Sequence, residues 1–332
     1  MYEGIAGVSE QRRRGFSPCT GDIIPILYEN MRIKKNLKWA LVLAGGGARG
    51  IAHVGVLNAL LEMGIPEPSL VVGTSMGAII GGLYACGMSP GELSRFLIND
   101  FDITEYLDSF VFKISGAMGK IFQTGQILGN AATRPGIDSG QQVLKLLEDL
   151  SGGKTFAETR IPFRCNAADL VSGKEVVFSS GSVARAMRGS MSFPGFFEPY
   201  WEGELCLADG GLCDNMPVRI AKDEGFKRIL AVDVGLLQPV ALSDLKTFSK
   251  IVYRSIEIML DGMERKRRPG ATLTIHAANG AIPFDFSRKR ELIELGERAV
   301  RESKEAVLPF FSGGMIAYAT RRRRRECGIS GT

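Results

Sequence analysis

The sequence predicts an α/β fold in which one mostly parallel central sheet carries helices on both faces. Strand-like and helix-like segments alternate from residue 39 onward, which is typical of parallel sheets. Two glycine-rich turns, at residues 45–50 and 73–77, each join a strand-like run to a helix-like run. The chain has 332 residues, 45% hydrophobic and 23% charged, enough for one large core. We see no internal repeat and predict no second folded domain.

The first half of this domain begins with two strand–helix units. A predicted strand at 39–44 leads through Gly45-Gly46-Gly47-Ala48-Arg49-Gly50 into a predicted helix at 51–63. A second strand at 70–73 leads through Gly73-Thr74-Ser75-Met76-Gly77 into a helix at 76–85. Residues 68–91 carry no charge and are long enough to suggest a membrane span. Their glycines and the Ser75 turn favour a buried strand–turn–helix instead.

The middle of the chain contains two further helices around an irregular stretch. Ser89-Pro90-Gly91-Glu92 is a capping box that opens a helix toward Asn99. Residues 101–137 lack clear periodicity, so we expect either connecting structure or a mobile apolar lid over the site. Asp138 or Ser139 is predicted to cap a helix through Leu150, which Gly152-Gly153 ends.

The remaining elements complete the alternation. A strand pair is predicted at 163–170 and 175–178, a short helix at 183–189 and a rigid apolar loop at 192–199. A short apolar segment lies at 205–208. Further strands are predicted at 228–234 and 271–275, with helices at 245–265 and 289–307.

The two ends of the chain are predicted to lie outside the folded domain. We expect a poorly ordered N-terminal extension at 1–36, the folded domain at 37–310 and a basic tail at 311–332. Met31 is a plausible alternative start. We see no targeting signal, which favours the cytoplasm. The net charge of +5 is small, and the arginine run at 321–325 is not interleaved with aromatic residues. We therefore expect no nucleic-acid partner, but a peripheral contact with anionic lipid is compatible with the tail.

Metal and cofactor sites are not expected. The six cysteines form no CxxC pair and the chain has two histidines, so a structural zinc site is disfavoured and free thiols are the simpler interpretation. Gly45-x-Gly47-x-x-Gly50 fits a dinucleotide fingerprint, which requires an acidic residue at the end of the next strand. Glu67 precedes that strand, so nucleotide binding is disfavoured.

The two glycine-rich turns favour acyl-transfer chemistry. Gly-x-Ser-x-Gly after a strand is typical of a nucleophile elbow, with Ser75 exposed on a tight turn. A glycine loop that opens a helix directs backbone N–H groups at one point, where an oxyanion can be stabilised. Ser75 in a plain tight turn is the alternative, which the upstream glycine loop makes less attractive.

A nucleophilic serine needs a base, and three residues are candidates. His53 lies one turn into the helix after the glycine loop, where we expect packing or a hydrogen bond. Ser75, Asp209 and His276 follow one another in the chain order of an α/β-hydrolase triad. Asp209 itself is the stronger candidate, because the glycines of Asp209-Gly210-Gly211 permit close backbone approach. A simple turn at Asp-Gly is the alternative.

The chain resembles the patatin-like phospholipases. The matching residues are Gly45-Gly46-Gly47-Ala48-Arg49-Gly50, Gly73-Thr74-Ser75-Met76-Gly77 and Asp209-Gly210-Gly211, supported by Ser190-Met191-Ser192-Phe193-Pro194-Gly195 and Asn215-x-Pro217. They occur in family order over roughly residues 37–310.

The resemblance implies a metal-free serine acyl hydrolase acting on lipid or other acyl esters. Ser75 would be the nucleophile and Asp209 the base, with no catalytic histidine. The oxyanion would be held by the loop Gly45, Gly46, Gly47, Ala48, Arg49 and Gly50, and Gly73, Gly77, Gly210 and Gly211 would support the motifs. A dry apolar pocket would raise the pKa of Asp209 and strengthen it as a base.

Two other functions stay open at this point. One is a Ser-His-Asp esterase that uses His276, and the other is a lipid-binding or regulatory protein on the same fold. Arg49 could attract an anionic head group, although a salt bridge that fixes the loop is the preferred role. Oligomeric state is left open.

Overall fold

One eight-stranded sheet organises the described part of the chain. The computed structural model describes residues 33–107, 136, 138–235, 237–246, 248–267, 270–278, 280–283 and 285–312. The strand order is β5-β6-β3-β2-β1-β7-β8, and β4 pairs with β3 outside this path. The strands are β1 (Ala40–Leu43), β2 (Leu70–Gly73), β3 (Phe163–Asp169), β4 (Lys174–Phe178), β5 (Tyr200–Glu202), β6 (Leu205–Asp209), β7 (Ile229–Asp233) and β8 (Leu273–His276).

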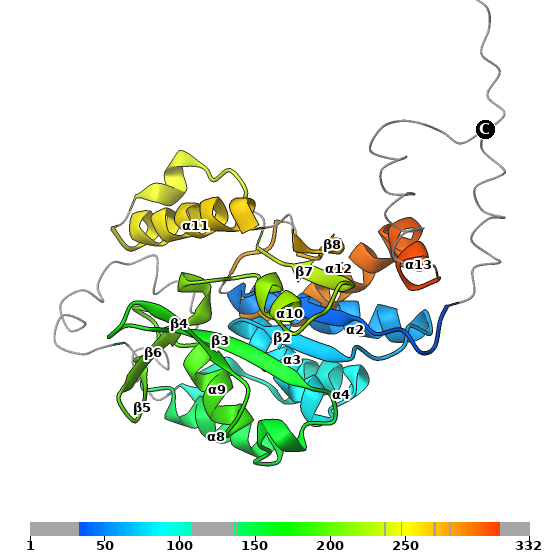
Figure 1. The fold of residues 1–332 in the computed structure, drawn as a ribbon. Coiled ribbons are helices and arrows are strands. Elements are labelled where there is room, and N and C mark those ends of the chain that lie inside the picture. Colours follow the sequence, from blue (N-terminus) through cyan, green and yellow to red (C-terminus); the bar gives the residue numbers. More distant parts are fainter. Residues whose placement is uncertain are drawn as a thin grey trace, which may run out of the picture. The chain divides into compact units, whose positions relative to one another are not determined.

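The sheet is parallel at its centre and antiparallel at one side. β3, β2, β1, β7 and β8 run parallel, in a register that aligns Leu43 with Gly73. β3 continues past β2, and its second half pairs antiparallel with β4 and β6, so that Ala167 aligns with Asp209. Figure 1 shows β4, β5 and β6 together at the left of the sheet. The registers place the carboxyl ends of β1 and β2 and the end of β6 at one edge of the sheet.

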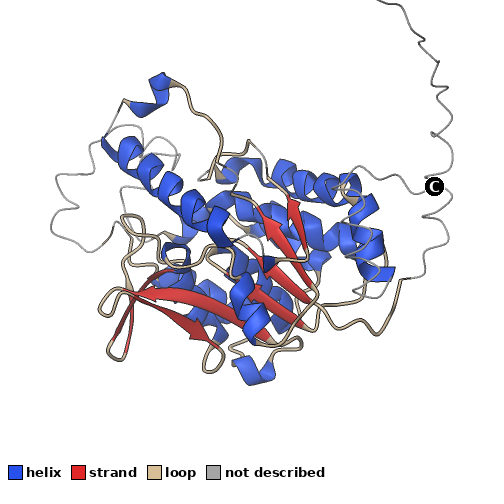
Figure 2. Ribbon diagram, turned by 45° about the horizontal axis from the view of Figure 1, so that its top comes forward, coloured by secondary structure: helices blue, strands red, loops and turns tan. Residues whose placement is uncertain are grey.

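Helices cover both faces of the sheet (Figure 2). They are α2 (Ala52–Glu62), α3 (Met76–Cys86), α4 (Pro90–Arg95), α8 (Gln141–Ser151), α9 (Val183–Ser190), α10 (Val218–Asp223), α11 (Phe248–Arg267), α12 (Lys289–Glu302) and α13 (Lys304–Ser312). None of the described helices is both long and apolar enough to cross a membrane. The uncharged run 68–91 includes β2 and α3.

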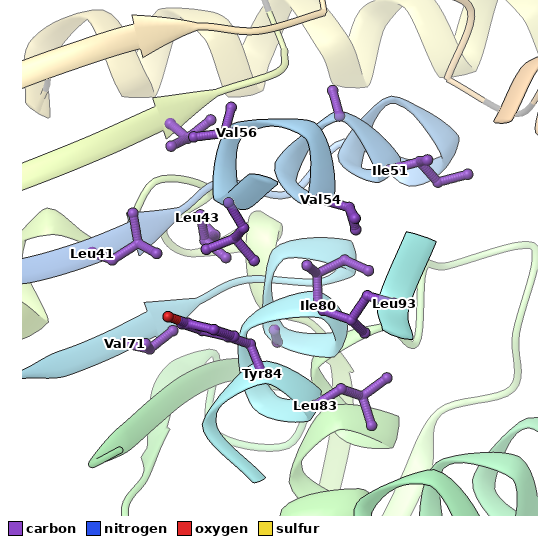
Figure 3. Close-up of a cluster of buried hydrophobic side chains, with 14 of the residues drawn as sticks. Leu41, Leu43, Ile51, Val54, Val56, Val71, Ile80, Leu83, Tyr84 and Leu93 are labelled. Carbon is purple, nitrogen blue, oxygen red and sulfur yellow. The ribbon is translucent and has the colours of Figure 1, made fainter. Parts of the chain in front are cut away.

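Alternate residues of the central strands pack into two separate hydrophobic cores, one on each face of the sheet. Leu41 and Leu43 pack with α2, α3 and their neighbours in the larger cluster, where they lie among side chains such as Val54 and Ile80 (Figure 3). Ala40 and Val42 pack on the opposite face with residues of α10. Burial on both faces explains why these strands are continuous apolar runs.

The predicted mostly parallel α/β fold is confirmed, with three local differences. β5, β6 and α10 were not predicted as a strand or helix; the segment of β6 was recognised only as apolar. α8 begins after Gly140, which lies at its N-cap position, while the Asp138 carboxylate accepts the Gly140 N–H at 2.8 Å. The helix predicted at 289–307 is divided into α12 and α13 at Ser303.

Several predictions concern residues that are not described. The N-terminal extension up to residue 32, the alternative start Met31 and the tail at 313–332 lie outside the described residues, as does most of the predicted lid, residues 108–135 and 137.

Candidate active site

Ser75 occupies a sharp turn between β2 and α3. Its φ of 53° and ψ of −122° make it the one non-glycine residue with positive φ in the described part of the chain. Such a backbone conformation costs about 1–3 kcal/mol and persists where the surroundings enforce it. The Ser75 N–H donates to the Ser190 hydroxyl at 2.9 Å, and the Gly77 N–H donates to the Thr74 carbonyl at 2.8 Å. These bonds hold the predicted elbow in place.

The glycines that flank Ser75 are required by packing. A Cβ atom at Gly73 would collide with the carbonyl of Gly77, and one at Gly77 would collide with the carbonyl of Leu43 at the end of β1. Because neither neighbour is a flexible side chain, the elbow can pack against the sheet only without these two side chains.

Asp209 ends β6 and faces the elbow. Asp209 is 4% exposed, and its carboxylate accepts the Gly211 N–H at 2.8 Å. The Ser75 hydroxyl is near enough to favour the ionised carboxylate and so to lower its pKa. The Asp209 N–H donates to the Ser192 carbonyl at 2.9 Å. Burial raises the pKa of Asp209 to about 6, while the Ser75 hydroxyl and the Gly211 N–H oppose the shift. The expected rise in this pKa is therefore present.

A buried polar network joins the elbow to the Asp209 loop. Asn166 Nδ2 donates to the Asp214 carbonyl at 2.9 Å, and the Thr74 hydroxyl lies 2.7 Å from Asn166 Oδ1 and 3.0 Å from the same carbonyl. The sequence analysis did not single out Asn166. Its signal was a polar residue within the apolar strand β3, where a buried amide requires hydrogen-bond partners.

The glycine loop presents two N–H groups without partners. Gly45 N–H donates to the Asn215 carbonyl at 3.0 Å and Ala48 N–H to the Pro283 carbonyl at 2.6 Å, so both are already engaged. The N–H groups of Gly46 and Gly47 donate to no group among the described residues. Both glycines line the same pocket as Ser75.

Arg49 fixes the orientation of this loop. Its Nε donates to the Gly46 carbonyl at 3.3 Å, and its Nη1 lies 3.9 Å from Glu257 Oε1 of α11. Because the Gly46 carbonyl and the Gly47 N–H belong to one planar peptide, holding the carbonyl turns the N–H to the opposite side. The preferred salt-bridge role of Arg49 is thus present in the structure.

The pocket above Ser75 is mostly apolar. It has a cavity volume of about 170 Å³. Its polar end contains Ser75, Asp209 and the glycine loop. The other walls include apolar side chains from α3, α4, the π-helical turn Phe96–Asp100, α8, α11 and the loop after α9. Among them are Ile79, Leu83, Leu93, Leu97, Val143, Leu147, Phe193, Phe196, Ile256 and Leu260. An acyl chain fits such walls, because burying its methylene groups is favourable.

Among the described residues, neither histidine forms a hydrogen bond with Ser75 or Asp209. His53 is buried, its Nε2 donates to the Ala44 carbonyl at 2.8 Å, and burial lowers its pKa to about 4. This confirms the expected hydrogen-bonding role. His276 Nδ1 lies 3.1 Å from Asp233 on the adjacent strand. His276 ends β8, which lies three strand positions from β2. At ordinary strand spacing this separates β8 from β2 by about 14 Å. A triad that joins His276 to Ser75 is therefore disfavoured.

Arg188 connects the loops behind Asp209. It is 1% exposed, and its guanidinium donates to the carbonyls of Gly140, Ser139 and Glu198 and to the Ser192 hydroxyl, at 3.2, 2.7, 3.0 and 2.5 Å. Ser192 in turn supplies the carbonyl that accepts the Asp209 N–H. Sequence reasoning did not identify Arg188, since a basic residue in a short helix normally lies in solvent.

The comparisons with known proteins agree on one family. The model of the patatin-like phospholipases matches residues 41–222. Lysophospholipase nte1 of Emericella nidulans is 37% identical over 197 residues, which is 59% of this chain and 12% of the relative. Lysophospholipase NTE1 of Saccharomyces cerevisiae is 34% identical over 209 residues, 61% of this chain and 11% of the relative. The chain thus spans a small part of the length of these relatives.

Solved structures of two other proteins are also similar. Human GIVD cytosolic phospholipase A2, in complex with methyl gamma-linolenyl fluorophosphonate, matches with a TM-score of 0.45 and 13% identity, over 85% of this chain and 59% of that one. VipD from Legionella pneumophila matches with a TM-score of 0.46 and 16% identity, over 81% and 66% of the two chains.

Proposed function

Since the chain belongs to the patatin-like phospholipase family, we propose that it is a serine acyl hydrolase that cleaves glycerolipid or lysophospholipid esters. The observation that carries the proposal is the buried Asp209 carboxylate, which lines the polar end of an apolar pocket together with Ser75. The names of the relatives, lysophospholipases, favour a substrate with a single acyl chain.

The reaction uses Ser75 and Asp209 as a dyad. Ser75 Oγ attacks the ester carbonyl carbon while its proton passes to the Asp209 carboxylate. The protonated Asp209 then gives the proton to the leaving alkoxide as the acyl–serine ester forms. Water attacks this ester while its proton goes to Asp209. Asp209 then returns the proton to Ser75 Oγ as the bond to the acyl carbon breaks, which releases the fatty acid and restores the Ser75 hydroxyl. A pKa near 6 makes Asp209 a stronger base than an ordinary carboxylate with a pKa of 3.8.

Gly46 and Gly47 are the proposed oxyanion donors. Both glycines line the same pocket as Ser75, and their N–H groups are not engaged by other described residues, whereas those of Gly45 and Ala48 are. The N-terminus of α3, which begins directly after Ser75, adds its partial positive charge. Removing one such donor typically costs about 10²–10³ in kcat.

The mechanism requires no metal or cofactor. We propose a cytoplasmic location for the protein. Cysteines 86, 165, 206 and 213 are free thiols among the described residues, as is usual in a reducing compartment.

Labelling with a fluorophosphonate probe tests the dyad. We expect covalent labelling of the wild type, none of Ser75→Ala, a strong loss for Asp209→Asn, and wild-type labelling of His276→Ala. Loss of labelling in His276→Ala would instead indicate the triad. A folded wild type that neither reacts nor hydrolyses any acyl ester would show that the fold serves lipid binding without turnover.

A further inference from the structure

Helix α11 is apolar on two sides. Ile256 and Leu260 line the pocket on its inner side. Ile251, Ile258 and Met259 are 50%, 53% and 52% exposed, and their spacing of seven and eight residues places them on one outer stripe. In both views α11 lies at the margin of the described residues (Figures 1 and 2). The helix therefore separates the pocket from an exposed apolar stripe.

Other exposed apolar residues lie at the same edge of the sheet. Val240 and Leu242, which is 87% exposed, follow the carboxyl end of β7. Ile282 is 58% exposed and precedes Pro283, whose carbonyl accepts the N–H of Ala48 in the glycine loop. Exposed apolar residues that gather beside a pocket mark an interaction surface more often than scattered ones do.

The sequence of α11 and its flanking residues has more basic than acidic side chains. Residues 246–268 contain seven lysines and arginines against three acidic residues. Two of these acidic residues, Glu257 and Asp261, belong to the pocket side of α11, and Glu257 is bridged by Arg49 and Arg254. A helix with an apolar stripe and a basic surround is typical of helices that lie in the interface of anionic membranes.

We propose that the outer stripe of α11, with Val240, Leu242 and Ile282 beside it, docks on an anionic lipid surface. This proposal rests on the proposed hydrolase function and specifies how its substrate is reached. The apolar side chains enter the acyl boundary, the basic residues contact the head groups, and a substrate acyl chain passes along the inner side of α11 toward Ser75. The docking surface is distinct from the arginine tail considered in the sequence analysis.

Vesicle co-sedimentation of the full chain tests the surface. We use Ser75→Ala protein, so that binding is measured without turnover, on vesicles of equal parts phosphatidylcholine and phosphatidylglycerol. The triple variant Ile251→Ser, Ile258→Ser, Met259→Ser should bind about tenfold more weakly or worse. The matched control Leu61→Ser removes a side chain that is 61% exposed near the end of α2, and should bind normally.

A second measurement separates docking from folding and from catalysis. With Ser75 intact, the triple variant should keep wild-type turnover of a water-soluble short-chain ester but lose hydrolysis of vesicle lipid. Unchanged vesicle binding by the triple variant overturns the proposal. The proposal is also overturned if the wild type is a dimer and the three substitutions dissociate it without weakening vesicle binding. The stripe would then join two copies of the chain. Failure of the hydrolase proposal would appear only in the turnover assays, not in vesicle binding.

Discussion

Replacing Asp209 by asparagine should stabilise the folded protein above pH 6. The folded-state pKa is about 6, raised mainly by burial from an ordinary 3.8. Below pH 4 the carboxyl is protonated in both folded and unfolded chains and costs nothing. As pH rises from about 4 to about 6, the unfolded chain ionises first, so the wild type loses stability. At 1.36 kcal/mol per pH unit this loss reaches about 3 kcal/mol.

Urea unfolding at a series of pH values measures this effect. The free energy of unfolding of Asp209→Asn minus that of the wild type should grow by about 2 kcal/mol between pH 4 and pH 6, the larger part of the total of about 3 kcal/mol, and should level off above pH 7. Any pH-independent difference in stability between the aspartic acid and asparagine side chains is the same at every pH, so it does not affect this change with pH.

Asp169→Asn is the control for this experiment. A hydrogen bond from the Ser172 hydroxyl is the main reason that the pKa of Asp169 is lowered to about 2, so its linkage lies below pH 4 and has the opposite sign. Its difference from the wild type should be flat between pH 4 and 6. A flat curve for Asp209→Asn over the same window would refute the argument that burial makes Asp209 the base.

Three further predictions follow from the same geometry. With a water-soluble ester, kcat/KM should fall about tenfold per pH unit below pH 6 and level off above it, because Asp209 must be ionised to accept a proton; a profile flat from pH 4 to 8 would contradict this. Gly77→Ala should cost roughly 3 kcal/mol or more in urea unfolding, because its methyl group meets the carbonyl at the end of β1, whereas Gly91→Ala has open space and should change stability by less than about 1 kcal/mol. Arg188→Met should lower the free energy of unfolding by about 3 kcal/mol and should lower kcat, because three carbonyls lose their donor. Arg188→Lys should not restore kcat, since one ammonium group cannot reach all three carbonyls. Full activity in either Arg188 variant would show that Asp209 is positioned without Arg188.

The alternation of elements and the motif turns could be predicted from the sequence because both depend on short-range rules. Continuous apolar runs predict buried parallel strands, and a capping box such as that at Ser89 begins a helix whatever surrounds it. Glycines around Ser75 indicate a turn too tight for side chains. These local preferences were sufficient for the fold class and for the choice of Ser75 and Asp209 as candidates.

The relative placement of distant segments was decided only by tertiary structure. Ser75 and Asp209 lie far apart in sequence and meet because β3 extends past β2 and pairs with β6. The same strand order leaves His276 beside Asp233, although chain order alone allowed a triad. The burial that raises the pKa of Asp209 results from contacts with many elements. The carbonyls that engage the N–H groups of Gly45 and Ala48 likewise come from distant segments of the chain. Local sequence carries the propensity of each segment, while pairing register and burial depend on packing of the whole chain.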